Sequence, residues 1–398
     1  MNEATPQASP QAAPQADPQA GPRRIQVMLP MLGEEEEQAA AAAIRSGWVA
    51  QGPRVAQFER EFATAVGAGH GVAVSSCTTA LHLALVLHGV GPGDEVVVPS
   101  LSFIATANAV RHAGAEPVFA DVDLATGNLT VATIEAVRTG RTRAVIAVHQ
   151  GGMPFDTVAL RAAAASWGVP LIEDAACAAG STAYGRSVGT GAAVSAWSFH
   201  PRKVITTGEG GMLTLDDTEG ATRLRRLREH GMNVSAAERH ASAQPVLEAY
   251  LETAFNYRMT DIQAAVGLVQ LGRLPGLVAG RRAMAARYHE LLAGIDGLVP
   301  VTDPPYGETN FQSFWVLIDP AYGVGRDEVL AELATAGVSA RRGIMAAHLE
   351  PAYAHVTPAP LPVTERLTRD SLILPLHHAL TGADQEHVVA VLRKLAGR

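Results

Sequence analysis

Cysteine is scarce in this sequence. The 398 residues include two cysteines, Cys77 and Cys177, and neither belongs to a C-x-x-C pair. We therefore expect neither a disulfide framework nor a cysteine-ligated zinc site, and a reducing cytoplasm is the expected compartment. The 14 histidines form no H-E-x-x-H motif and no cluster with the cysteines. No metal site is therefore expected.

Positive charge is not in excess either. The net charge is −8, so nothing draws the chain as a whole toward nucleic acid or an anionic membrane. No run of about 18 apolar residues occurs, and we expect no membrane span. Residues 1–24 alternate proline, glutamine and alanine without the basic and apolar regions of a signal peptide. They are predicted to be a disordered tail.

Short apolar runs alternate with amphipathic stretches from about residue 70 onward. Runs such as GVAV (71–74) and EVVVP (95–99) are each followed by a helical pattern. This order is typical of βαβ units and predicts an α/β fold with a largely parallel sheet covered on both faces. The length allows two domains. We predict a large domain at 25–274 and a smaller α+β domain at 275–398.

Further elements follow from local patterns. Strands are predicted at 193–199 and 211–217, and two helical stretches at 260–274 and 279–294. The small domain is expected to contain strands at 313–319 and 371–376 and helices from 327 and 382. Thr381 stands three residues before Asp384, which is typical of a capping box.

The segment SSCTTALHLAL (75–85) places small polar residues between a strand and a helix. Free N–H groups and the positive end of the helix dipole would lie beside Ser76, Cys77 and Thr78, which suits a phosphate group. The alternative is that these hydroxyl side chains only cap the helix.

The segment PLIEDA (170–175) leads an apolar strand into Glu173 and Asp174. The carboxyl ends of strands in open α/β sheets border the ligand crevice. A buried ionised aspartate there needs a cationic partner, and a protonated pyridine nitrogen is one. The alternative is again a helix cap.

The segment SFHPRKVITTGEGG (198–211) places Lys203 on a loop after Pro201 has ended a strand. Gly208, Gly210 and Gly211 follow, and we expect them to use positive φ in a tight turn. A lysine in a desolvated pocket is a usable amine nucleophile. The alternative is an ordinary solvated lysine.

Taken together, a phosphate cradle, a strand-end aspartate and a loop lysine are the parts needed to hold pyridoxal 5′-phosphate (PLP). Phe103, which follows another strand, would supply a face that stacks on the cofactor ring. Its alternative is a core aromatic residue.

Six motifs in this order resemble the DegT/DnrJ/StrS-type sugar aminotransferases, from about residue 25 to the end. They are SGWVAQGPRVAQFEREFA, SSCTTALHLAL, GPGDEVVVPSLSFIATANAV, IEDAACAAGS, SFHPRKVITTGEGG and NYRMTDIQAAVG. The family consists of PLP enzymes with the aspartate aminotransferase fold, the PLP-dependent transferase fold type I. The resemblance implies a large domain with a mostly parallel mixed sheet and a smaller C-terminal α+β domain.

The resemblance also implies roles for single residues. Lys203 would form the internal aldimine and carry the proton, and Asp174 would bind the pyridine nitrogen. Phe103 would stack on the ring.

The phosphate would be held by a second group of residues. These are the backbone around Ser76 and Cys77, the Thr78 hydroxyl and Ser198. Asn256, in NYRM, would reach the phosphate from the neighbouring subunit, which implies a homodimer with shared active sites.

One position departs from the family pattern. Many members have Gln or His near the phenolic oxygen of the cofactor, where this chain has Cys177, and a thiol is a weaker hydrogen-bond partner. His200 and His348 are the candidate substrate contacts. The alternative for His348 is a solvated loop histidine.

The implied activity is a ping-pong transamination. L-glutamate or L-glutamine would donate the amine, and a nucleotide-linked keto sugar would accept it, in amino-sugar or natural-product biosynthesis. Family members with histidine in place of the lysine dehydrate sugars, so Lys203 favours transamination. The alternatives are a cyclitol ketone or other non-sugar carbonyl as acceptor, or a non-catalytic PLP-binding regulatory protein.

Overall fold

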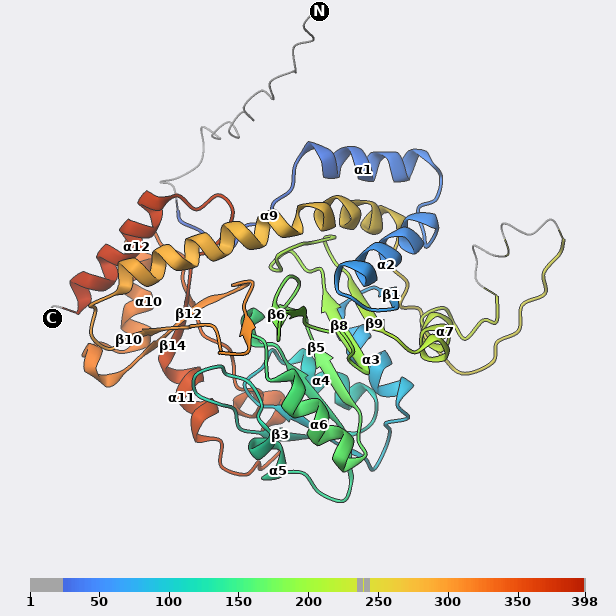
Figure 1. Cartoon of the computed structure of the whole chain (residues 1–398), viewed down its shortest axis with the longest axis horizontal. Helices are drawn as coiled ribbons and strands as arrows, with labels where there is room; N and C mark the ends of the chain where they lie inside the picture. Colours follow the sequence, from blue (N-terminus) through green and yellow to red (C-terminus); the bar gives the residue numbers. More distant parts are fainter. Residues whose placement is uncertain (1–23, 235–238, 240–243, 397–398) are drawn as a thin grey trace, which may run out of the picture.

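The computed structural model of the chain describes residues 24–234, 239 and 244–396. The tail predicted for residues 1–24 therefore lies outside the described residues, apart from Arg24. A twisted seven-stranded sheet forms the centre, and helices pack against both of its faces (Figure 1).

The central sheet is largely parallel, as predicted. Its strand order is β1-β9-β8-β5-β4-β2-β3, and only β9 runs antiparallel to its neighbours. The strands are β1 (His70–Val74), β2 (Glu95–Pro99), β3 (Glu116–Ala120), β4 (Thr142–Val148), β5 (Leu171–Asp174), β8 (Val194–Ser198) and β9 (Gly211–Leu215). The two strands predicted on either side of Lys203, at 193–199 and 211–217, are therefore β8 and β9.

Both faces of this sheet are buried. On β1, Val72 and Val74 belong to one core cluster, whereas Ala73 points to the opposite face and packs with Phe58 and Phe62. Such two-sided burial explains why the strands read as continuous apolar runs. The surrounding helices are α1 (Glu34–Arg45), α2 (Pro53–Ala65), α3 (Cys77–Leu87), α4 (Ala105–His112), α5 (Val131–Glu135), α6 (Thr157–Trp167) and α7 (Thr218–Leu227).

Two smaller antiparallel sheets complete the fold. The four-stranded sheet has the order β10-β12-β14-β13, and the three-stranded sheet has the order β11-β6-β7. Their strands are β6 (Thr182–Ala183), β7 (Arg186–Ser187), β10 (Leu298–Pro300), β11 (Gly307–Glu308), β12 (Phe314–Ile318), β13 (Arg341–Arg342) and β14 (Ser371–Leu374).

Three helices pack with the C-terminal strands, namely α10 (Arg326–Thr335), α11 (Pro362–Asp370) and α12 (Gly382–Leu395). The predicted capping box is present at the start of α12. The Asp384 N–H donates to the Thr381 hydroxyl at 3.1 Å, and the Asp384 carboxylate accepts from the Thr381 N–H at 2.9 Å. The strands and helices predicted for this region are confirmed.

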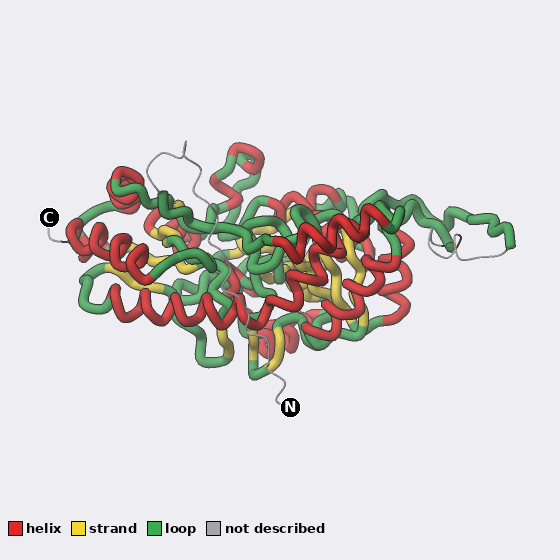
Figure 2. Tube along the Cα trace, turned by 90° about the horizontal axis from the view of Figure 1, so that it is seen from above, coloured by secondary structure: helices red, strands yellow, loops and turns green. Residues whose placement is uncertain are grey.

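Helix α9 (Asp261–Leu292) joins the two helical stretches that the sequence predicted separately. It runs as one 32-residue helix through Pro275 and lies across the molecule from the large sheet to the C-terminal sheet (Figures 1 and 2). The predicted boundary between residues 274 and 275 lies inside this helix, so the division into two domains stays a prediction.

The same helix is long and apolar enough to cross a membrane by length and composition alone. A core helix passes the same test, and α9 packs against α1 and α2. Its buried residues extend from its first position to its last.

An aromatic cluster packs residues 197–199, just before the Lys203 loop, against α2. The Phe199 ring lies 5.1 Å from the rings of both Phe58 and Phe62, measured between centroids. Trp197 donates its indole N–H to the Thr214 hydroxyl at 2.8 Å. The end of β8, from which Lys203 departs, is therefore held by buried packing.

Replacement of Phe199 should test this anchor. Phe199→Ala removes a fully buried ring, and we expect it to lower the free energy of unfolding by about 3 to 5 kcal/mol. Urea denaturation followed by circular dichroism measures the change. The control is Val158→Ala, because Val158 on α6 is 58% exposed and its truncation should change the value by less than about 0.5 kcal/mol. Equal midpoints for the two variants would contradict the assignment of Phe199 as an anchor.

Candidate active site

The candidate site lies where β5 and β8 end and where α3 and α4 begin. Parallel strands bring their carboxyl ends to one edge of a sheet, so the segments after β5 and β8 meet there. The structure thereby brings together Cys77, Asp174, Cys177 and Lys203, whose charges act on one another.

The start of α3 combines a cap with free hydrogen-bonding capacity. Ser76 is the N-cap, and its hydroxyl accepts the Thr79 N–H at 3.2 Å. The capping alternative is therefore correct for the Ser76 side chain. The Thr78 hydroxyl, by contrast, has no hydrogen bond to any residue that the structure describes, and the first N–H groups of α3 point away from the helix. This helix end can accept an anion.

The glycines after Lys203 serve two different purposes. Gly208 has a φ of 83°, as expected for the turn. Gly211 has no positive φ; instead a Cβ there would lie 2.4 Å from the carbonyl carbon of Ser76 and 2.7 Å from the Cys77 nitrogen. Gly210 is likewise crowded, with Met259 at 2.7 Å. The prediction of positive φ is thus wrong for Gly210 and Gly211, which allow β9 and its loop to approach α3 and the segment that precedes α9.

Asp174 ends β5 as a buried carboxylate. Its Oδ2 accepts from the Thr106 hydroxyl at 3.0 Å, and its Oδ1 accepts from the Ala176 N–H at 3.1 Å. Burial raises the pKa of Asp174, and the Ala176 N–H, Lys203 and Thr106 oppose this rise without cancelling it. No helix begins at this residue, so the helix-cap alternative is wrong for Asp174. Among the charged groups, Lys203 lowers the pKa of Asp174 most.

Glu173 points to the opposite face of the sheet, because successive side chains of a strand alternate. Its carboxylate accepts from the Arg161 Nε at 2.7 Å and lies 3.3 Å from the His149 Nε2. Burial alone would raise the pKa of Glu173, but the bonds to His149 and Arg161 outweigh it and lower that pKa. Glu173 is therefore a paired structural charge.

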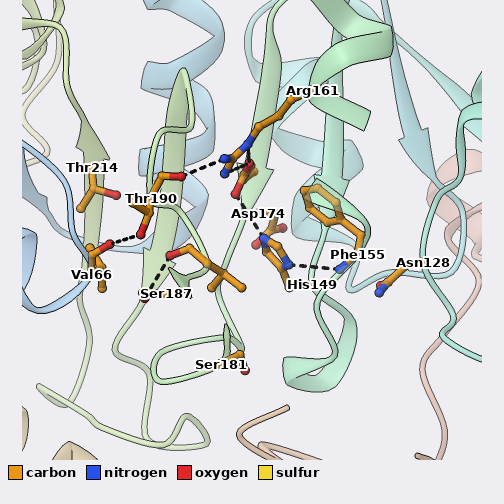
Figure 3. A network of polar contacts seen from close by, with 12 residues as sticks. Val66, Asn128, His149, Phe155, Arg161, Asp174, Ser181, Ser187, Thr190 and Thr214 are labelled. Carbon is orange, nitrogen blue, oxygen red and sulfur yellow. Dashed lines mark hydrogen bonds and ion pairs between the residues drawn. The ribbon is translucent and has the colours of Figure 1, made fainter. Parts of the chain in front are cut away.

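Figure 3 shows this network beneath Asp174. Arg161 also donates to the Thr190 carbonyl at 2.8 Å, and the Phe155 N–H donates to His149 Nδ1 at 3.4 Å. Because the Phe155 N–H donates to Nδ1, we assign Nε2 as the ring nitrogen that donates to Glu173. The backbone N–H of His149 also donates to the backbone carbonyl of Asp174 at 3.0 Å. The network thus fixes the backbone from which Asp174 projects.

Lys203 turns inward from its loop. Its Nζ donates to the Cys177 sulfur at 3.1 Å, so the solvated-lysine alternative is wrong. Burial alone would lower the pKa of Lys203, but Cys177, Cys77 and Asp174 outweigh burial and raise it. Burial is also the first cause of a strongly raised pKa at Cys77, and Asp174 adds to it.

A cavity of about 590 Å³ opens beside Lys203. Its lining includes Lys203, Met31, Arg273, Arg281 and His378. Both arginines already have partners, since Arg281 donates to backbone carbonyls and Arg273 pairs with glutamates of α1. Cys77, Asp174 and Cys177 do not line this cavity, so it adjoins the lysine loop and not the Asp174 carboxylate.

Three other residues expected at the site lie around this edge of the sheet. Phe103 precedes α4 with 68% of its surface exposed, so the core-aromatic alternative is wrong. Ser198 is buried at the end of β8, where its hydroxyl accepts the His200 N–H at 3.4 Å. Asn256 is exposed. The segment that contains it borders the start of α3, where the Tyr257 carbonyl accepts from the Ser75 N–H at 2.8 Å.

The two candidate substrate histidines differ in their surroundings. His200 is partly exposed, and its Nδ1 accepts the Arg202 N–H at 3.1 Å. Burial lowers the pKa of His200. His348 is not a solvated loop residue: its side chain is 7% exposed, lies 2.6 Å from the Ser100 hydroxyl and pairs with Glu365 at 3.6 Å. The role of either histidine in substrate binding stays a prediction.

Sequence reasoning missed Thr106. Its hydroxyl bonds to both Asp174 and Ser102, the latter at 2.8 Å. The available signal was a hydroxyl residue in the first turn of a helix that follows a buried strand, three positions after Phe103. No group of three or more histidine, cysteine, aspartate or glutamate side chains that could hold a metal occurs among the described residues.

Comparisons with known proteins agree with this geometry. The model of the DegT/DnrJ/EryC1/StrS aminotransferase family matches residues 30–393. The chain is 38% identical over 372 residues to the spore coat polysaccharide biosynthesis protein SpsC of Bacillus subtilis, covering 92% of this chain and 96% of SpsC.

Two solved structures share the fold over nearly the whole chain. DesI, determined in the presence of its TDP-sugar product, is 34% identical with a TM-score of 0.85, covering 96% of this chain and 95% of DesI. The sugar aminotransferase Spr1654 of Streptococcus pneumoniae in its PLP-form is 26% identical with a TM-score of 0.87, covering 94% of this chain and 99% of Spr1654. The expected fold and resemblance are confirmed, and the chain belongs to the DegT/DnrJ/EryC1/StrS aminotransferase family.

Proposed function

We propose that this chain is a PLP-dependent sugar aminotransferase. The observation that carries the proposal is the meeting of Lys203 and the buried Asp174 at one edge of the sheet, beside the free helix end at Thr78. The PLP-form of Spr1654 supports the choice of cofactor.

The residues present fit PLP in charge and in hydrogen-bonding capacity. Asp174 is 5% exposed with a raised pKa, and a protonated pyridine nitrogen is the cationic partner that such a carboxylate needs. When bound, PLP supplies an electron sink for the carbanion that forms when the donor loses its α-proton. Thr106 and the Ala176 N–H orient the carboxylate for this contact.

Lys203 supplies the amine that binds the cofactor covalently and moves the proton during transfer. Its inward direction and its short distance to Cys177 keep Nζ inside the site rather than in solvent. Of the chain's two lysines, Lys203 and Lys394, only Lys203 lies in this site.

The remaining contacts are proposed from the family pattern. The start of α3, the Thr78 hydroxyl and Ser198 hold the phosphate, and the exposed Phe103 covers the ring. Asn256 completes the site of a second subunit.

A homodimer is consistent with one projecting segment. The loop that contains residues 244–251 extends away from the body of the molecule (Figure 1) and exposes Leu247, Tyr250 and Leu251 by 92%, 62% and 58%. Exposed apolar side chains of this kind mark an interaction surface.

The proposed reaction is a ping-pong transfer from L-glutamate or L-glutamine to a nucleotide-linked keto sugar, in the cytoplasm. The TDP-sugar product of DesI and the polysaccharide pathway of SpsC support this acceptor class. A cyclitol ketone or another carbonyl compound is an alternative acceptor that the experiments below address.

The spectrum of the loaded enzyme tests transamination directly. The protein loaded with PLP should be yellow near neutral pH and lose this colour when glutamate or glutamine is added, because the amine passes to the cofactor. Absorbance spectroscopy follows the change. Colour that persists with every amino donor would instead identify a non-catalytic PLP-binding protein.

Borohydride reduction tests the role of Lys203. Reduction followed by peptide mass spectrometry should place the cofactor mass on Lys203, while the exposed Lys394 serves as an internal control without it. Lys203→Ala should retain cofactor without a reducible bond, and its transamination rate should fall by about 10² to 10⁴-fold. Cofactor trapped on Lys394, or on the Lys203→Ala variant, would refute the assignment.

The acceptor class requires a panel of substrates. We expect amine products from nucleotide-linked keto sugars when glutamate or glutamine is the donor, detected by mass spectrometry. Cyclitol ketones and simple keto acids form the comparison set. A preference for a cyclitol ketone would support the transaminase assignment and contradict the proposal of a sugar acceptor.

A further inference from the structure

Cys177 makes a direct contact with the reactive nitrogen of the site. The Lys203 Nζ donates to its sulfur at 3.1 Å, well within the range for a bond to sulfur. The thiol is held in place by its own backbone, because the Cys177 carbonyl accepts from the Asn310 amide at 2.8 Å and the next residue closes a turn onto Ala175. The contact therefore joins two positioned groups.

We propose that Cys177 is the proton partner of Lys203, a positioning residue that shares one proton with the lysine amine whenever this amine is not bonded to the cofactor. Proton exchange breaks an N–H bond and forms an S–H bond, or the reverse, with no change in oxidation state. The pair alternates between ammonium with thiolate and amine with thiol, at constant net charge.

Neighbouring groups decide the balance of this pair. Asp174 from β5 favours the ammonium form of Lys203, whereas the half-buried Cys77 from α3 has a strongly raised pKa and stays a thiol. The other titratable or charged groups near Lys203 are His200, Arg202, Arg273, Arg281 and His378. Cys177 raises the pKa of Lys203 more than Asp174 does, so the contact of 3.1 Å between Nζ and the sulfur is the stronger support for the ammonium form.

The catalytic meaning of the pair rests on the proposed function. After the first half-reaction the amine of Lys203 is released beside Cys177. A sulfur at hydrogen-bond distance keeps Nζ in place and supplies or takes the proton, which an amide side chain at this position cannot do. Cys177 then sets the lowest pH at which the released lysine acts as a base.

Thiol reactivity in the cofactor-free protein tests the pair without any turnover. Iodoacetamide reacts with thiolates, and Lys203→Met removes the cation that contacts the Cys177 sulfur. Alkylation of Cys177 at pH 7 should therefore slow by about tenfold. Peptide mass spectrometry separates Cys177 from Cys77. Lys394→Met, which removes the other lysine at an exposed position, should leave the rate unchanged. Equal alkylation rates in the two variants would overturn the proposal.

The reverse experiment guards against misfolding of the lysine variant. In Cys177→Ser the hydroxyl retains a hydrogen bond but does not ionise near neutral pH, so the amine of Lys203 should be less often protonated. Its acetylation by acetic anhydride at pH 8, relative to Lys394, should rise by about tenfold. An unchanged ratio would show that the contact carries no proton exchange.

The pyridoxamine-loaded enzyme links the pair to catalysis. Cys177 raises the pKa of Lys203, so Cys177→Ser should move the acid limb of kcat/KM for 2-oxoglutarate to lower pH by about one unit. If the acid limb of kcat/KM stays at the same pH, the proposal that Cys177 and Lys203 exchange a proton is contradicted. Borohydride trapping in the same variant separates the Cys177 proposal from the proposed function. If trapping on Lys203 persists while the acid limb does not move, the aminotransferase assignment stands and the Cys177 proposal is wrong.

Discussion

The charge balance around Asp174 is the constraint on which the site depends. A carboxylate with 5% of its surface exposed is unfavourable unless cations or hydrogen-bond donors surround it. Thr106 and the Ala176 N–H provide two donors, and the Lys203 charge helps, but burial still raises the pKa of Asp174. The Asp174 carboxylate therefore suits a cationic ligand group, and a protonated pyridine ring would supply that charge.

The parallel sheet makes this arrangement possible. Asp174 follows β5 and Lys203 follows β8, two neighbouring strands with the same direction, so both segments leave the sheet at one edge. Burial on both faces holds the strands, and the Phe199 cluster secures the end of β8. The Glu173 network secures β5 from the opposite face. The packed strands thus position side chains that stand on the connections between them.

Close backbone approach is the second requirement. Gly211 allows β9 to lie against the Ser76 carbonyl and the Cys77 nitrogen, where no Cβ would fit. The start of α3 is thereby held beside the lysine loop, and Cys77, Cys177 and Lys203 share one small volume. Both cysteines of the chain lie in this volume, which is why a thiol became available as a partner for the lysine amine.

Much of this could be inferred from sequence. Alternating apolar runs determined the α/β class, and the order of SSCTTALHLAL, IEDAACAAGS and SFHPRKVITTGEGG determined the family and the roles expected for Asp174 and Lys203, because strand ends and helix starts have local signatures. Tertiary structure alone decided which face Glu173 occupies and that Thr106 supports Asp174. It also decided that Gly211 serves close packing rather than positive φ, that one helix crosses position 275, and that Cys177 contacts Lys203. These features depend on distances between segments far apart in the chain, and local patterns carry no information about such distances.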